Sequence, residues 1–252
     1  RKVNMRCGRN LIDAADGGLG NDMTYPRYPA YKPSGVVWLG EIPAHWDVKK
    51  VKNIASKIGS GKTPSGGSEV YVDSGILFIR SQNVYDDGLK LDSPVFISES
   101  VDNSMPGSRV QPNDVLLNIT GASIGRCCLY NNGMPRANVN QHVCIIRPST
   151  NIVPLFLAYA LQSQNTKHQI LSDENGTSRE GLNYQQVGNL CFTCPDFAEE
   201  QTAIAAFLDR ETAQIDELVA RQERLIALLQ EKRQALISHA VTQGLNPAAP
   251  MK

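Results

Sequence analysis

The segment from Phe197 to Gln243 contains neither glycine nor proline, and no other stretch of this sequence constrains the fold as strongly. Its apolar residues recur at alternating steps of four and three, the heptad spacing of a coiled coil rather than the wider stripe of a globular helix. The predicted seam comprises Ile204, Leu208, Ile215, Leu218, Leu225, Leu229 and Leu236, with Glu211, Gln222 and Lys232 as its polar members. Such a helix would be about 70 Å long, too long to be buried in the roughly 200 residues before it. We therefore predict a spacer and pairing device.

The ends of this segment carry helix start and stop signals. Asp196, with Glu199 three residues on, predicts a capping box, and Gly244 predicts the stop. We therefore expect the helix over residues 196–243 and a tail over 244–252. The alternative is an amphipathic helix packed on its own domain, but the polar seam positions favour a defined partner and register. The spacing alone does not separate parallel from antiparallel pairing.

Composition bounds the protein class. A chain of 252 residues can bury one good core or two small ones, and its formal net charge is zero. No stretch is apolar and long enough to cross a membrane, and the polar, glycine-rich residues 1–22 contain no secretory signal. We expect a cytoplasmic protein with Met23 as its natural start. Residues 1–24 are then an extension that is disordered or foreign to the natural chain.

The cysteines and histidines do not form a metal pattern. Cys191 and Cys194 make a single CxxC, whereas a zinc site needs four ligands. The four histidines, at positions 45, 142, 168 and 239, show no metal spacing. We expect reduced structural cysteines, no metal and no cofactor.

Residues 25–195 predict an α/β (α+β) domain ahead of the helix. Residues 25–46, rich in proline, tyrosine and tryptophan, are typical of an extended arm, and 47–58 of a short helix or strand. Short β-like runs bounded by turn residues lie at 75–80, 114–120, 126–130, 143–147 and 190–193. Helices are predicted at 154–170 and from about Asn183, with polar loops at 59–68 and 172–183.

The loop Gly59-Ser-Gly-Lys-Thr63 invites comparison with a phosphate-binding Walker A motif. That motif needs an earlier glycine, but position 56 is serine, and Pro64 cannot continue the required helix. The sequence also contains no nucleophile elbow, no methyl-donor motif and no paired acids in a nuclease-like context. We interpret the loop as one that presents Lys62 and Thr63 to a phosphate backbone, and the chain as a binding module without catalytic residues.

Polar residues gather at the ends of several predicted strands. Gln82 and Asn83 follow Arg80, while Asn138, Asn140, Gln141 and His142 precede the strand at 143–147. The two glycines of 118–126 predict a hairpin with Thr120, Ser123 and Arg126 at its tip. Asn and Gln can bond adenine in the major groove, Arg and Lys can bond guanine, and hydroxyls suit phosphate. Turn chemistry is the alternative for any one of these residues.

Taken in order, these segments resemble the DNA-specificity subunits of type I restriction–modification enzymes. The resemblance begins with the arm from Tyr28 to Trp46 and includes 61–64, 79–83, 121–126 and 140–141. It continues through Gly176-Thr177, Glu200-Gln201 and IAAFLDRETAQID (204–216) to 237–247. It implies a target-recognition domain on a long helix. No single motif is decisive, but their order and spacing are specific.

The chain departs from the family in one respect, since members usually carry two recognition domains and two long helices. Here there is one of each, so the chain resembles a half-length subunit. The resemblance implies that two such helices pack antiparallel, and a second copy would supply the second helix. We expect a homodimer that reads a palindromic, interrupted site on double-stranded DNA.

The resemblance also implies partners and contact residues. Family subunits have no chemistry of their own and carry DNA adenine methyltransferase and ATP-dependent nuclease subunits to the site. The expected DNA contacts are Lys62, Thr63, Arg80, Gln82, Asn83, Ser123, Arg126, Asn140, Gln141 and Arg179. Two other functions stay open: a coiled-coil adaptor whose globular domain binds protein, and a nucleotide-hydrolysing enzyme that uses the loop at 59–63.

Overall fold

The computed structural model describes residues 26–64, 66, 70–174 and 181–245. Its strands are β1 (Tyr31–Pro33), β2 (Glu41–Pro43), β3 (Trp46–Lys50), β4 (Ala55–Ser60), β5 (Tyr71–Val72), β6 (Ile76–Ile79), β7 (Val84–Tyr85), β8 (Gly88–Leu89), β9 (Phe96–Ile97), β10 (Val115–Asn118), β11 (Cys127–Leu129), β12 (Ala137–Val139), β13 (Val143–Pro148) and β14 (Cys191–Pro195). Its α-helices are α1 (Val51–Ile54), α2 (Glu99–Ser104), α3 (Pro154–Gln162), α4 (Gln164–Glu174), α5 (Tyr184–Asn189) and α6 (Ala198–Gln243). Short 3-10 turns are η2 (Ser81–Asn83), η3 (Pro106–Ser108) and η4 (Gly121–Ser123). This is the expected mixed sheet-and-helix domain followed by one long helix.

The domain is built on two four-stranded sheets. The first has the order β11-β10-β13-β4 and is antiparallel, and the second has the order β12-β6-β9-β5 with β12 parallel to β6. Along β10, Val115 and Leu117 pack in the cluster that includes α3, whereas Leu116 packs in the cluster shared with β6 and β12. The first sheet is therefore covered on both faces, which explains why its central strands are continuously apolar.

Most expected elements are confirmed, with differences at helix ends. The helix predicted over 154–170 is wrong in its extent, because Ser163 interrupts it between α3 and α4. The Ser163 hydroxyl donates to the carbonyl of Ala160 and accepts from the amide of Thr166, so it satisfies the end of one helix and the start of the next. The segment 47–58 forms a strand, a helix and a second strand in turn. Strand β4 runs two residues into the loop expected at 59–68, and α4 runs three residues into the loop expected at 172–183.

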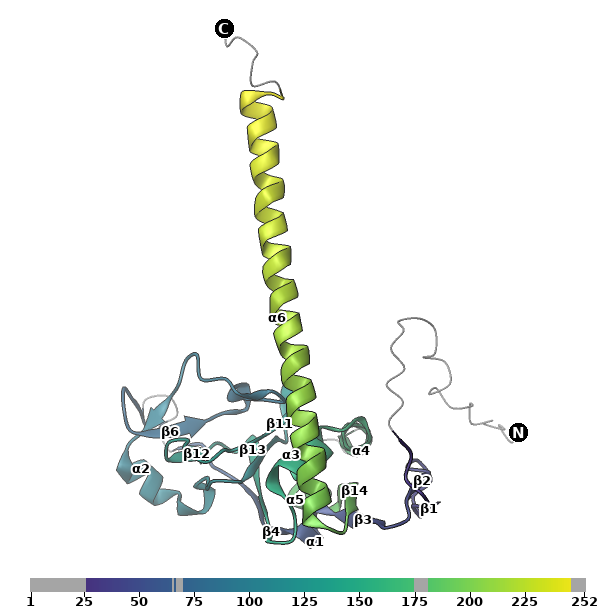
Figure 1. Cartoon of the computed structure of the whole chain (residues 1–252). Helices are drawn as coiled ribbons and strands as arrows, with labels where there is room; N and C mark the ends of the chain where they lie inside the picture. The colour runs from purple at the N-terminus through teal and green to yellow at the C-terminus, as the bar shows by residue number, and fades with distance from the viewer. Residues whose placement is uncertain (1–25, 65, 67–69, 175–180, 246–252) are drawn as a thin grey trace, which may run out of the picture.

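The long helix α6 begins at the base of the domain and extends well beyond the other described elements (Figure 1). The predicted capping box is wrong: Phe197, not Asp196, is the N-cap, and it makes no side-chain cap bond. Gln201 anchors the first turns instead, since its buried amide accepts from the Val153 amide at 2.8 Å and donates to the Pro195 carbonyl at 3.0 Å. The stop at Gly244 is confirmed by its φ of 70°.

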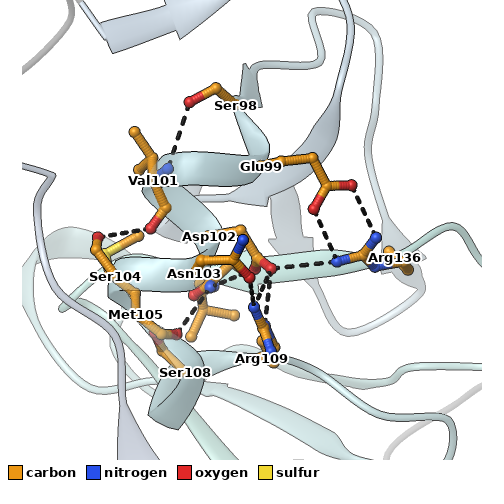
Figure 2. A network of polar contacts seen from close by, with 12 residues as sticks. Ser98, Glu99, Val101, Asp102, Asn103, Ser104, Met105, Ser108, Arg109 and Arg136 are labelled. Atoms are coloured by element: carbon orange, nitrogen blue, oxygen red, sulfur yellow. Dashed lines mark hydrogen bonds and ion pairs between the residues drawn. The ribbon is translucent and has the colours of Figure 1, made fainter.

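A buried carboxylate joins α2 to the second sheet (Figure 2). Asp102 is 1 % exposed and accepts from Asn138 Nδ2 at 2.9 Å and from Arg109 Nε at 2.7 Å. Arg136 also reaches Asp102, and its two terminal nitrogens bond Glu99 at the surface. Asn138 is fully buried in this network, so its polar side chain supports the fold.

Candidate functional site

The ends of six strands meet at one edge of the domain, which we term the strand-end edge: residues 61–64, 80–83, 119–126 and 140–142. Strands β4, β6, β10 and β12 end here, and β11 and β13 begin here. Backbone bonds join the loops, since Gly61 donates to the Asn140 carbonyl and Asn140 donates to the Ile79 carbonyl, both at 3.0 Å. Segments distant in the sequence are thereby brought onto one surface.

The buried side chain of Asn118 joins two of these loops by hydrogen bonds. Its fully buried amide nitrogen donates to the Ser81 carbonyl at 2.8 Å and to Ser123 Oγ at 3.0 Å. The hairpin expected at 118–126 is confirmed, with Gly121 and Gly125 at φ values of 72° and 83°. Ser123 is thus held at the tip and is partly buried.

Four polar side chains form a hydrogen-bonded row across the edge, which we term the Gln141 relay: Thr63, Gln141, His142 and Thr120. Thr63 Oγ1 donates to Gln141 Oε1 at 2.6 Å, and Gln141 Nε2 lies 2.9 Å from His142 Nε2. His142 Nδ1 lies 2.5 Å from Thr120 Oγ1. The row joins the loops after β4, β10 and β12, and Thr63 and Gln141 are its exposed members.

Three cations lie on the edge without a carboxylate partner among the described residues: Lys62, Arg80 and Arg126. Arg126 stacks over the ring of Tyr85, with its guanidinium carbon 4.5 Å from the ring centroid. Arg80 donates to the Ser93 carbonyl at 3.4 Å, while its buried Nε has no partner within the described chain. Unpaired cations at a surface attract polyanions.

A shallow hollow of about 410 Å³ lies beside Arg80, lined by Gln82, Asn83, Tyr85, Lys90, Asp92 and Ser93. Gln82 is exposed, but Asn83 is only 5 % exposed. The Asn83 amide accepts from the Arg80 amide and donates to the Lys90 carbonyl, so both of its polar atoms serve the turn. Asn140 likewise accepts from the His142 amide at 3.0 Å.

The edge therefore contains nine of the ten expected contact residues, in two groups. Lys62, Thr63, Arg80, Gln82, Ser123, Arg126 and Gln141 present polar groups on it, whereas Asn83 and Asn140 shape its turns. Arg179 lies outside the described residues, as do Gly176-Thr177 and residues 1–24. Sequence reasoning missed Tyr85 and Tyr184. The Tyr184 hydroxyl bonds Ser60 at 2.7 Å and joins α5 to the end of β4, a tertiary contact that no local sequence pattern indicates.

The seam of α6 divides into a packed part and an exposed part. Ile204 and Leu208 are partly buried near α3, and Tyr159 bonds Asp209 and Thr212 at 3.3 Å. Beyond that point Ile215, Leu218, Leu225, Leu229 and Leu236 are each 49–60 % exposed. An apolar stripe of this length on a helix is typical of a surface that another chain covers.

Burial makes the thiols of Cys127, Cys128, Cys144 and Cys194 poor nucleophiles and poor ligands. The described cysteines are all free, and desolvation raises the pKa of Cys128 and of Cys144 to about 12. Among the residues that the structure covers, no group of three His, Cys, Asp or Glu side chains could hold a metal ion. In the same part of the chain, no helix combines the length and hydropathy of a membrane span.

Comparison with known proteins gives matches across most of the chain. The family model described as the type I restriction modification DNA specificity domain matches residues 43–226. The chain is 22 % identical over 212 residues to the putative type I restriction enzyme MjaX specificity subunit of Methanocaldococcus jannaschii, covering 82 % of this chain and 48 % of that protein. It is 26 % identical over 170 residues to the EcoBI specificity subunit of Escherichia coli, covering 67 % and 35 %. The chain thus spans half or less of the length of these relatives.

Solved structures show the same fold. A chain from a study of assembly and conformational transition of the type I R-M system superposes with a TM-score of 0.64 at 21 % identity, covering 81 % of this chain and 47 % of that one. The HsdS subunit from Thermoanaerobacter tengcongensis gives a TM-score of 0.57, also at 21 % identity, covering 85 % and 48 %.

Proposed function

We propose a function from the premise that this chain belongs to the type I restriction modification DNA specificity family, whose model matches it over residues 43–226. The strand-end edge binds double-stranded DNA and reads one half-site. Helix α6 pairs with α6 of a second copy and holds two such edges on one DNA. The chain performs no chemistry itself and carries DNA adenine methyltransferase and ATP-dependent nuclease subunits to the site.

The observation that carries the DNA-binding part is the convergence of unpaired cations, hydroxyls and exposed amides on one edge. Lys62, Arg80 and Arg126 supply charge for phosphates, and the Ser123 hydroxyl, which accepts from Asn118, keeps its proton to donate to a phosphate. Thr63 donates to Gln141 and so orients that amide. Gln82 and Gln141 expose amide groups of the kind that recognise base edges. Asn83 and Asn140 support the loops from which these side chains project.

The binding test is a titration of duplexes selected from a random pool, repeated at several salt concentrations. Lys62→Ala should weaken binding to every duplex by a similar factor and reduce the salt slope by about one. Lys50→Ala is the matched control, since Lys50 is exposed at the end of β3 and lies before α1 and β4 in the chain. Strand β4, roughly 20 Å long, then leads to the edge. A salt-independent affinity, or equal effects of the two variants, would argue for the protein-binding adaptor instead.

Charge along α6 supports antiparallel pairing. Its first half, residues 198–220, carries six carboxylates against Arg210 alone, whereas residues 221–243 carry four cations against two carboxylates. Parallel copies would align like charges, and antiparallel copies align opposite ones. With the twofold axis near Gln222, that residue faces the partner's Gln222, and Glu211 lies within one turn of the partner's Lys232.

The pairing test is the solution mass by light scattering of full-length variants. Leu218→Ser with Leu225→Ser should convert a dimer into a monomer, because both residues lie on the exposed seam. Ala220→Ser with Ala227→Ser is the matched control, since each lies two positions on and about 200° around the helix. If the wild type were a monomer at micromolar concentration, the homodimer would be excluded. The exposed seam would then pair with a helix of a different protein.

A further inference from the structure

We propose that Gln141 is the residue of the strand-end edge that reads an adenine, and that Thr63 and His142 position its amide for this. The inference rests on the proposed DNA-binding function and deepens it, because it names one residue and one base. It follows from how the Gln141 relay uses the hydrogen-bonding capacity of the amide.

The relay engages each end of the Gln141 amide once. Thr63 Oγ1 donates to Oε1 at 2.6 Å, and Nε2 lies 2.9 Å from His142 Nε2. An amide oxygen has two lone pairs and an amide nitrogen has two N–H groups, so one acceptor and one donor of the amide remain unused. In the major groove adenine presents the N6 amino donor and the N7 acceptor, which complement that pair.

The proton arrangement along the relay is self-consistent. If Gln141 Nε2 donates to His142 Nε2, the neutral imidazole carries its proton on Nδ1 and donates to Thr120 Oγ1 at 2.5 Å. Reversing every donor in the row turns the amide over, yet still leaves one acceptor and one donor unused. The capacity to bond adenine therefore does not depend on the direction of the row.

Gly61 fixes the distance between the two sides of the relay. A Cβ at Gly61 would lie 1.6 Å from the Val139 carbonyl oxygen, so only glycine lets the loop after β4 pass this close to the end of β12. The backbone bond from Gly61 to Asn140 locks this approach two residues before Thr63. A held side chain loses less conformational entropy on binding than a free one.

The other amides on the edge differ from Gln141. Asn83 and Asn118 are buried and bond the protein interior, and Asn140 is partly buried and caps the turn to His142. Gln82 is exposed but has no side-chain hydrogen bond within the described residues. Gln141 alone among these five is both exposed and held at both ends.

The experiment uses the full chain and the duplex selected by the wild type. Each adenine in turn is replaced by 7-deazaadenine, which keeps the base pair but lacks the N7 acceptor. Wild type should lose affinity roughly fivefold or more at one adenine of each half-site. In Gln141→Ala the affinities for the normal and the substituted duplex should become about equal. Gln111→Ala, which removes an exposed amide before β10 at the end of the strand away from the edge, should keep the wild-type penalty.

The positioning role is tested with two variants of Thr63 that differ in one hydroxyl. Thr63→Val should lower the 7-deazaadenine penalty, and Thr63→Ser should restore it. A general loss of stability would not produce this rescue, because both variants preserve the backbone at an exposed position.

The outcomes separate the two proposals. If wild type selects a sequence but Gln141→Ala keeps every adenine penalty, or no adenine shows one, the assignment of Gln141 is overturned while DNA reading stands. If wild type binds no DNA or selects none, both are overturned.

Discussion

The carboxylate of Glu200 in the first turns of α6 accepts a hydrogen bond from the indole Nε1 of Trp46 at 3.0 Å. The same carboxylate accepts from the Tyr28 hydroxyl at 2.7 Å and bonds His45 Nε2 at 2.9 Å. The arm before β3 is therefore fastened to the start of the long helix. This contact adds to those of Gln201 and Tyr159, which hold the first turns of α6 on the domain.

The Glu200 cluster predicts a stability change with a defined pH dependence. Desolvation acts to raise the pKa of Glu200, but the bonds from Tyr28, Trp46 and His45 outweigh it and lower the pKa below its usual value. Their contribution is present above the unfolded-state pKa, about 4.3, and is lost as the pH falls through the lower folded-state pKa. Glu200→Gln should lower the free energy of unfolding by about 1–2 kcal/mol at pH 6.

Urea unfolding at pH 6 and in steps down to pH 3 measures this. The difference between wild type and Glu200→Gln should shrink towards the acid end, because the wild-type carboxylate becomes neutral as well. Glu199→Gln, an exposed neighbour in the same turn, should leave stability within about 0.5 kcal/mol. A gap between wild type and Glu200→Gln that is constant with pH would mean that charge on Glu200 does not contribute.

The close approach at Gly61 predicts a steric penalty. Gly61→Ala should lower the free energy of unfolding by roughly 1–3 kcal/mol, because the backbone of β12 must move away from the new Cβ. Gly107→Ala is the control, since a Cβ at Gly107 meets nothing within 4 Å. Equal denaturation midpoints for the two variants would show that Gly61 and the Val139 carbonyl are not close enough to exclude a Cβ.

The network in Figure 2 predicts a large loss of stability for one carboxylate of α2 and a small loss for another. Asp102→Ala should cost about 3–5 kcal/mol, because it leaves Asn138 and the Arg109 guanidinium without their buried acceptor. Glu99→Ala removes a pair whose side chains are both 63 % exposed, and it should cost less than about 1 kcal/mol. Thermal and urea unfolding of the two variants gives the comparison, and a costly Glu99→Ala would contradict it.

Pairing through α6 predicts the form of the DNA site. Selection from random duplexes should return two inverted half-sites with a fixed gap, because a C2 dimer presents identical edges in opposite orientations. The variant with Leu218→Ser and Leu225→Ser should still select a half-site but tolerate any gap. If a variant shown to be monomeric still selected a fixed gap, the gap would not depend on pairing through α6.

The long helix and the strand positions were determined by the sequence itself, because they depend on local periodicity. The heptad spacing and Gly244 located α6 and its end, and apolar runs between turn residues located β6, β10, β11 and β13. Helix starts and breaks were less predictable. Phe197 replaced Asp196 as the N-cap of α6, and Ser163 divided a helix, because each end depends on which backbone groups find partners in the folded domain.

The roles of the candidate site residues were decided by tertiary structure. Asn83 and Gln141 follow strands in similar sequence contexts, yet one amide is buried in its turn and the other is exposed between Thr63 and His142. The sequence determined that polar residues stand at strand ends. Only the pairing of β4, β10, β12 and β13 brought those ends to one edge, because the register between strands depends on residues far apart in the chain.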